Sequence, residues 1–250
     1  MGSHGDLYPD IPTLKSHLKE KRDFRVIHKN RRSFATIASP HGGFIEAGTS
    51  QIARAVAGPD FNLFDFQGLV TVEPQELHVT SSRFREPILM DMLSRSEVAV
   101  SIHGMGEEDD MTIWLGGLNL EMKARMLKSL TEAGFLVNPD SPRHRGESVR
   151  NFVNMVKRRG VQIELPNNLL NAMFVGKKFY GSGRAVKTTA LFDSFVTAVR
   201  NVVHDERNYG ANDTPSNAQK PHVKSVRARP RRRSPSKKSN GLKNTGFSDG

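Results

Sequence analysis

The chain has 250 residues, with 37 Lys and Arg against 26 Asp and Glu, and it contains no cysteine. The lack of cysteine excludes disulfides, thiolate metal sites and cysteine nucleophiles, so any metal would be held by His, Asp or Glu. The formal net charge is +11, of which +8 lies in residues 213–250, where ten Lys and Arg face two Asp. No apolar run is long enough for a signal peptide or a membrane span, so we expect a cytoplasmic protein that cell lysis could also release.

The length suits one α/β domain followed by a tail. We predict a single domain over residues 1–210 and a disordered basic tail over 211–250, because the tail is rich in Pro, Ser, Asn, Lys and Arg and nearly lacks large apolar residues. The basic residues within 220–243 could bind nucleic acid through counterion release, although a solvated tail is the commoner meaning of such a composition. We favour a monomer.

The predicted elements alternate between strands and helices along the chain. Residues 23–28 and 33–39 are predicted to be two strands that pair through a turn at 29–31. A helix is predicted to start at an N-cap on Thr49 or Ser50 and to stop at Gly58. The later predicted strands are 77–81, 97–104, 111–117, 135–138 and 161–165. The later predicted helices are 87–96, 119–134, 147–160 and 188–206. This order predicts an open mixed β-sheet covered by helices on both faces.

Polar residues follow three of the predicted strands. The run "FATIASPHGG" leads into His41, "VAVSIHG" ends at His103, and "VQIEL" ends near Glu164. In α/β sheets, ligand crevices form at the edge where the carboxyl ends of the strands lie. We therefore expect the two histidines and the glutamate to converge there from distant parts of the chain.

Glu46 lies five residues after His41, across the glycines Gly42 and Gly43. This spacing does not fit an i, i+4 pair on a helix, but a loop that turns at glycines can aim both side chains at one point. Catalytic zinc often takes two His and one Glu and leaves a fourth position for water. The sequence thus suggests one zinc ion on His41, Glu46 and His103, and it suggests Glu164 as the base that takes the proton of the attacking water.

Each of these residues also has a purely structural interpretation. His41 and His103 could belong to ordinary turns, Glu46 could stabilise the N-terminus of a helix, and Glu164 could be a surface carboxylate. His78, in another predicted strand, is interpreted as a hydrogen-bonded core histidine in preference to a fourth metal ligand.

Several blocks follow one another in an order that is far more specific than any single motif. They are "DFRVI", "HGGFIEAGTSQIARAVAG", "DFNLFDFQG", "LHVTSSRFREP", "VAVSIHG", "GGLN", "EAGF", "RGESVRNFVN" and "GVQIELP". Through these blocks, from residue 8 to about residue 175, the chain resembles the phage-type poly-gamma-glutamate hydrolases, whose relatives are often labelled phage-related replication proteins. The resemblance implies a zinc carboxypeptidase-like fold with a single zinc. It also implies that the ligands fall on His41, Glu46 and His103, and the catalytic glutamate on Glu164.

The implied activity is zinc-dependent hydrolysis of amide bonds, first among them the gamma-glutamyl bonds of poly-gamma-glutamate. One departure concerns the binding of an anionic substrate: "NNLLNAMF" follows "VQIELP", where an arginine is expected in this family. Five arginines could replace that cation. They are Arg83, Arg85, Arg143, Arg145 and Arg150. Two alternatives stay open, namely a nucleic-acid-binding protein that uses the basic tail, and a family member that binds its polymer without cleaving it.

Overall fold

The structure is a computed structural model, and the residues it describes are 5–69, 72–106, 111–140, 145–177, 179 and 186–212. The chain divides into two units, Met1–Thr214 and Pro215–Gly250. The predicted basic tail, with its residues 220–243, falls outside the described residues from position 213 onward. Among the described helices, none combines the length and apolar character needed to span a membrane.

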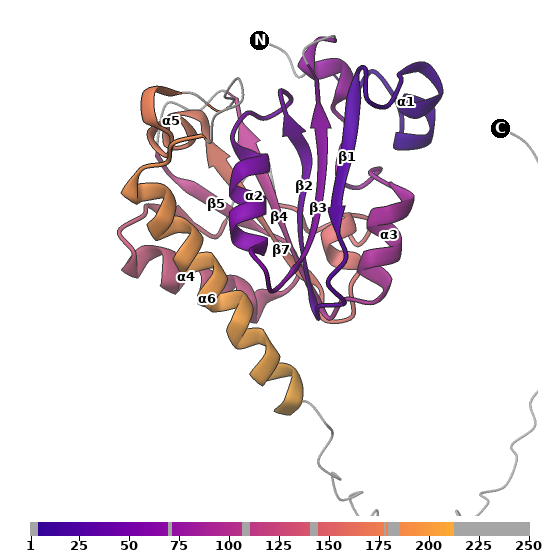
Figure 1. Cartoon of the computed structure of the whole chain (residues 1–250). Helices are drawn as coiled ribbons and strands as arrows, with labels where there is room; N and C mark the ends of the chain where they lie inside the picture. Colours follow the sequence, from indigo (N-terminus) through magenta and orange to yellow (C-terminus); the bar gives the residue numbers. More distant parts are fainter. Residues whose placement is uncertain are drawn as a thin grey trace, which may run out of the picture. The chain divides into compact units, whose positions relative to one another are not determined.

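A seven-stranded mixed sheet lies at the centre of the first unit, with the strand order β1-β3-β2-β4-β7-β5-β6 (Figure 1). The strands are β1 (Phe24–Lys29), β2 (Ala35–Gly43), β3 (Asn62–Gly68), β4 (Val98–Met105), β5 (Ile113–Gly116), β6 (Val137–Asn138) and β7 (Gly160–Pro166). Neighbours β3, β2, β4 and β7 run parallel, whereas β1 and β5 run antiparallel to β3 and β7. Every residue of β2, β3 and β7 is buried, as expected of central strands covered on both faces. The predicted open mixed sheet is confirmed.

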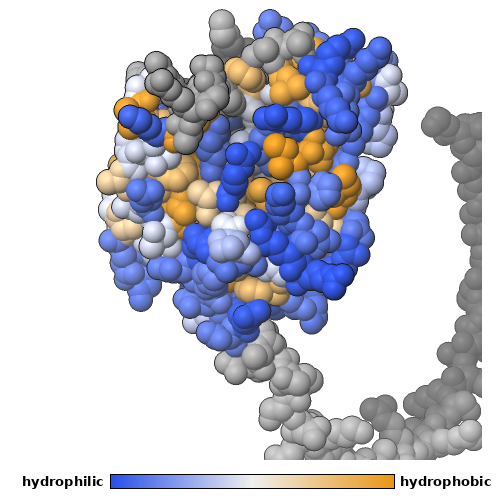
Figure 2. Space-filling model, in the orientation of Figure 1, coloured by the Kyte–Doolittle hydropathy of each residue, from blue (hydrophilic) through white to orange (hydrophobic). Residues whose placement is uncertain are grey.

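Helices cover both faces of this sheet (Figure 1). The helices are α1 (Ile11–His17), α2 (Thr49–Ala57), α3 (Pro87–Ser94), α4 (Leu120–Glu132), α5 (Asn167–Ala172) and α6 (Ala190–Asn212), with 3-10 helices at Pro74–Leu77, Phe152–Met155 and Val175–Lys177. Helices α2, α4 and α6 share one apolar cluster with Ile37 and Val100. Helices α1 and α3 share another with Ala38 and Ala99, the adjacent residues in β2 and β4, whose side chains point to the opposite face. Hydrophilic residues cover most of the face seen in Figure 2, with smaller apolar patches between them.

The predicted pairing of the first two strands is wrong. Strand β3 lies between them, antiparallel to β1 and parallel to β2. The connection is held by Asn62 at the start of β3, whose Oδ1 accepts hydrogen bonds from the Arg31 and Ser33 amides at 2.8 and 3.1 Å. These amides are therefore satisfied without a hairpin, and sequence proximity of the two strands was a misleading guide to their pairing.

Two other predicted elements differ. Residues 77–81 are not a strand: the 3-10 helix Pro74–Leu77 ends there, and the Thr80 amide donates to the Asp6 carboxylate at 2.8 Å, where a strand would donate to a neighbouring strand. The helix predicted over 147–160 is only the 3-10 helix Phe152–Met155, with Asn151 accepting a hydrogen bond from the Val153 amide.

A buried ionic cluster joins α6 to α4 and to the segment before β7. Glu206 in α6 is fully buried and forms ion pairs with Arg125 and Arg158, the latter at 3.0 Å between Nη1 and Oε2. The Arg158 guanidinium also donates to the Glu206 carbonyl at 2.8 Å. Loss of the carboxylate would leave two partly buried cations without their common partner.

We expect Glu206→Ala to lower the free energy of unfolding by about 3 kcal/mol, because removing one member of a buried ion pair leaves its partners as uncompensated charges. Glu132→Ala, which breaks an exposed pair with Lys128 on α4, should change it by no more than about 0.5 kcal/mol. Urea unfolding of the two variants measures both values. Equal effects would show that the Glu206 cluster contributes no more than a surface pair.

Candidate metal centre

His41 lies where β2 departs from regular pairing. The register of β2 with β3 shifts between Ser39 and Gly42, and the pairing of β2 with β4 ends at Ala38. Such an irregularity re-aims side chains near the end of a strand. His41 is nevertheless buried, with 2% of its surface exposed.

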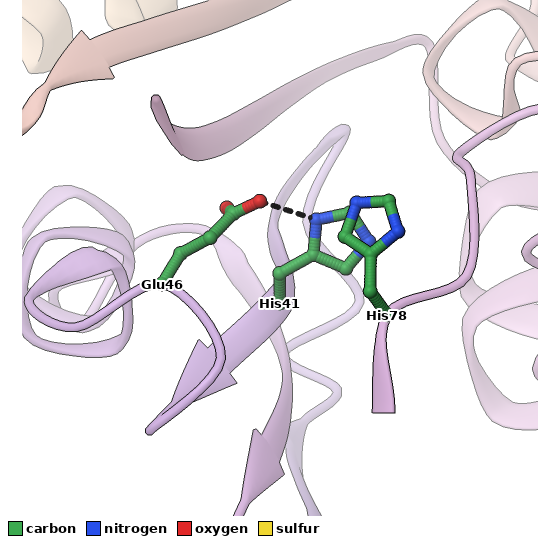
Figure 3. A group of neighbouring side chains, drawn as sticks. All are labelled: His41, Glu46 and His78. Atoms are coloured by element: carbon green, nitrogen blue, oxygen red, sulfur yellow. Dashed lines mark hydrogen bonds and ion pairs between the residues drawn. The ribbon is translucent and has the colours of Figure 1, made fainter. Parts of the chain in front are cut away.

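The two ring nitrogens of His41 have different partners. Nε2 lies 3.0 Å from the Val79 carbonyl oxygen and donates to it, because a carbonyl can only accept. Nδ1 faces the Glu46 carboxylate, with 2.8 Å between Nδ1 and Oε1 (Figure 3). A hydrogen bond from Nε2 to a carbonyl is the arrangement that leaves Nδ1 available to a metal.

Glu46 reaches this position through a tight loop. Its amide donates to the His41 carbonyl at 2.9 Å, and its Oε2 accepts a hydrogen bond from the Gly104 amide at 2.8 Å. The loop requires glycine twice: Gly43 has a φ of +67°, and a Cβ on Gly42 would collide with Asp65 and Ser50. The predicted role of these glycines, to let the loop turn, agrees with this geometry.

The predicted N-cap on Thr49 or Ser50 is wrong. The N-cap of α2 is Gly48, with a φ of +103°. The Thr49 hydroxyl instead donates to the Glu46 carbonyl at 2.8 Å, and the Ser50 hydroxyl donates to Asp65 while accepting from the Gly43 amide. Both hydroxyls therefore fasten the loop that carries Glu46, and tertiary contacts outcompete the local cap.

His103 lies against the same two side chains. Its Nδ1 is 3.3 Å from His41 Nδ1 and 3.7 Å from Glu46 Oε2, and its Nε2 is 3.4 Å from the Ser81 hydroxyl. Two nitrogens bound to one tetrahedral zinc at about 2.0 Å would lie roughly 3.3 Å apart. The three predicted ligands are thus close enough to hold one ion, and their role as ligands stays a prediction.

His78 is a further candidate that the sequence assigned to the core. Donor atoms of His41, Glu46 and His78 all lie within 4.8 Å of one another (Figure 3). However, 40% of the His78 side chain is exposed, so its assignment to the core is wrong, whereas the expected hydrogen bond exists, from Nδ1 to Asp6 at 2.7 Å. The His78 and His41 rings lie 4.1 Å apart at an interplanar angle of 33°, and the His41 and His103 rings lie 5.0 Å apart at 69°.

The electrostatics of His41 and Glu46 are coupled. Burial lowers the pKa of the His41 imidazole, but the Glu46 carboxylate and the Val79 carbonyl outweigh it and raise that pKa above its ordinary value. Burial raises the pKa of Glu46, but His41, His103 and the Gly104 amide together lower it below its ordinary value. The pair therefore favours a carboxylate beside a positive charge, which is the charge pattern that a bound cation would also satisfy.

Glu164 lies beside His103 because the two residues are register partners on the parallel strands β4 and β7. It is buried, with 5% of its surface exposed, and its Oε1 accepts a hydrogen bond from Gln162 Nε2 at 2.6 Å. Burial first, and then the Glu46 charge, raise the pKa of Glu164 well above its ordinary value. The interpretation of Glu164 as a surface carboxylate is therefore wrong.

The five arginines that could bind an anionic substrate differ in their partners and exposure. Arg83 forms an ion pair with Asp6 at 2.5 Å, and Arg85 donates to the Arg150 carbonyl at 2.6 Å. The side chains of Arg145 and Arg150 are exposed, while Arg143 falls outside the described residues. Burial and the nearby Arg150 charge lower the pKa of Arg85.

Sequence reasoning missed the partners that orient these side chains. The Val79 carbonyl and the Gly104 amide are backbone groups, which carry no residue-type signal. Gln162 did carry one, since it stands two positions before Glu164 on the same face of a strand and can therefore reach it.

A family model described as "Poly-gamma-glutamate hydrolase" matches residues 8–198. Among curated proteins, UPF0714 protein YndL of Bacillus subtilis is 34% identical over 173 residues, which cover 68% of this chain and 67% of YndL. The SPbeta prophage-derived UPF0714 protein YoqZ of the same organism is 29% identical over 204 residues, covering 80% of this chain and 72% of YoqZ.

Two solved structures share the fold. A bacteriophage poly-gamma-glutamate hydrolase matches with a TM-score of 0.76 and 28% identity, over 82% of this chain and 99% of that chain. Zinc-free, apo YndL matches with a TM-score of 0.72 and 32% identity, over 80% of this chain and 98% of that chain. These matches confirm the resemblance found in the sequence: the chain belongs to the poly-gamma-glutamate hydrolase family.

Proposed function

We propose that this protein is a zinc-dependent enzyme that hydrolyses the gamma-glutamyl amide bonds of poly-gamma-glutamate. Membership of the family supports the reaction and the substrate. The observation that carries the zinc proposal is the meeting of three side chains: His41 Nδ1 lies 2.8 Å from Glu46 Oε1 and 3.3 Å from His103 Nδ1, and His103 Nδ1 lies 3.7 Å from Glu46 Oε2. The apo structure of the relative YndL, described as zinc-free, gives further support for this metal.

The donor set fits zinc in kind as well as in spacing. Two imidazole nitrogens and a carboxylate oxygen are common ligands of catalytic zinc, and a fourth position is then left for water or substrate. Zinc bound there would act as a Lewis acid on the scissile carbonyl and would lower the pKa of a bound water. The Val79 carbonyl and the Ser81 hydroxyl hold the outer nitrogens of His41 and His103, which fixes the orientation of both rings.

Glu164 is the proposed general base. It takes a proton from the attacking water and passes that proton to the leaving amine, so the amide carbon gains an oxygen as the C–N bond breaks. Gln162 donates to Oε1 and so orients the carboxylate for this transfer. The raised pKa of Glu164 makes its carboxylate a stronger proton acceptor than that of an ordinary glutamate.

The direct test is incubation with poly-gamma-glutamate followed by sizing of the polymer. We expect the full chain to shorten the polymer, a zinc chelator to abolish shortening, and added zinc to restore it, because the reaction depends on the ion. Poly-alpha-glutamate, which has the same charge and a different amide linkage, is the matched control. Polymer of unchanged length with zinc-loaded protein would refute the proposed activity.

We expect His103→Ala to reduce bound zinc from near one ion per chain to below about a tenth of that, because two donors hold zinc much more weakly than three. His204→Ala changes an exposed histidine of α6 beside Asp60 and should leave the zinc content unchanged. Metal analysis after dialysis measures both, with circular dichroism to show that each variant is folded.

The same analysis on His78→Ala decides between the two possible ligand sets. Zinc that stays bound in His78→Ala and is lost in His103→Ala supports His103 as the third ligand. The reverse pattern would replace His103 with His78.

We expect Glu164→Gln to lower kcat by about 100-fold to 10,000-fold with little change in zinc content, because the amide cannot accept the proton. Glu147→Gln, at an exposed carboxylate, should retain activity close to that of the unchanged protein. Steady-state kinetics and metal analysis check both effects. A Glu164→Gln enzyme with normal kcat would exclude Glu164 as the base.

A further inference from the structure

We propose that Asp6, near the N-terminus, is a positioning residue of the metal centre, where it fastens the segment that orients His41 and His103. That segment is residues 78–81, called here the orienting segment. The inference rests on the proposed function, since it concerns the affinity for zinc. Asp6 lies outside the stretch 8–198 that matches the family, so the inference comes from this chain's own contacts.

The orienting segment contacts the outer side of both histidines. The His78 ring packs at a tilt against the His41 ring with centroids 4.1 Å apart, and the Val79 carbonyl accepts from His41 Nε2 at 3.0 Å. The Ser81 hydroxyl lies 3.4 Å from His103 Nε2. A shift of this segment would therefore rotate or release the two rings that supply nitrogen donors.

The orienting segment has no strand to hold it, since it follows a 3-10 helix and lies outside the sheet ladder. The segment is held in part by the Phe152 amide, which donates to the Ser81 carbonyl at 3.3 Å, and by the buried Val79 side chain. Asp6 adds a further attachment with both carboxylate oxygens. Oδ1 pairs with His78 Nδ1 at 2.7 Å, and Oδ2 accepts from the Thr80 amide at 2.8 Å. Arg83, just beyond the segment, donates to the same Oδ2 at 2.5 Å.

The low exposure of the Asp6 side chain distinguishes these contacts from an ion pair on the surface. Only 4% of the Asp6 side chain is exposed, although Gly5 and Leu7 on either side are exposed. Burial alone would raise the pKa of Asp6, but the Thr80 amide and His78 lower it below its ordinary value, so the carboxylate is charged at neutral pH. A charged acceptor with three donors holds its partners more firmly than a neutral one.

The test compares Asp6→Ala with Asp10→Ala in the full chain. Asp10 belongs to the same N-terminal stretch and caps α1 by accepting from the Thr13 amide at 2.8 Å, so its loss disturbs the local fold. Zinc affinity is measured by competition with a chelator. Hydrogen exchange of residues 78–83 is measured on zinc-free protein.

We expect Asp6→Ala to weaken zinc affinity about 10-fold to 100-fold, as the loss of a group that orients metal ligands does elsewhere, and to speed exchange in residues 78–83. Asp6→Asn keeps an acceptor for Thr80 and should fall between Asp6→Ala and the unchanged chain. Asp10→Ala should leave zinc affinity and this exchange unchanged, even where it lowers the melting temperature.

Unchanged zinc affinity in Asp6→Ala, or an equal loss in Asp10→Ala, would overturn the inference, because Asp6 would then serve the fold alone. A failure of the proposed function is distinguishable, since the unchanged chain would then hold no zinc. The exchange measurement on zinc-free protein would in that case still show whether Asp6 fastens the orienting segment.

Discussion

The centre depends on one interaction, the pairing of the buried His41 imidazole with the Glu46 carboxylate. Ionisable groups removed from water are stable only where partners satisfy them, so the surrounding chain must supply those partners. It does so with backbone groups from two separate segments, the Val79 carbonyl and the Gly104 amide. Gly42, Gly43 and the hydroxyls of Thr49 and Ser50 shape the loop that carries Glu46, and the end of β4 supplies the Gly104 amide.

The sheet and the loops contribute to the centre in different ways. Strands β4 and β7 carry His103 and Glu164 on a rigid ladder. The loop with Glu46 and the orienting segment lie outside that ladder and are held by side-chain hydrogen bonds instead. Residues on the ladder are placed by regular backbone pairing, whereas residues in the loops need dedicated anchors, which is why polar contacts concentrate around them.

Much of this arrangement could be predicted from the sequence where the signal was local. Apolar runs marked β2, β4 and β7, and the polar residues at their ends led to His41, His103 and Glu164. Non-local features could not be predicted. Strand β3 inserts between two strands that are neighbours in sequence.

The orienting segment shows the same limit. It is fastened by a residue that lies 72 positions from His78, and no sequence pattern announces such a contact. The N-cap of α2 was predicted wrongly for a related reason, since the Thr49 and Ser50 hydroxyls bind other partners than the amides of the first turn.

The register between His103 and Glu164 has a consequence for how such a centre can diverge. Adjacent strands lie about 4.8 Å apart, so the main chain sets the spacing of the backbone positions from which the His103 and Glu164 side chains extend. Side-chain changes elsewhere cannot alter that spacing, and a one-residue slip would turn one of the two groups to the opposite face. Loops around the sheet can therefore change in length and sequence while the relative placement of these two residues stays fixed.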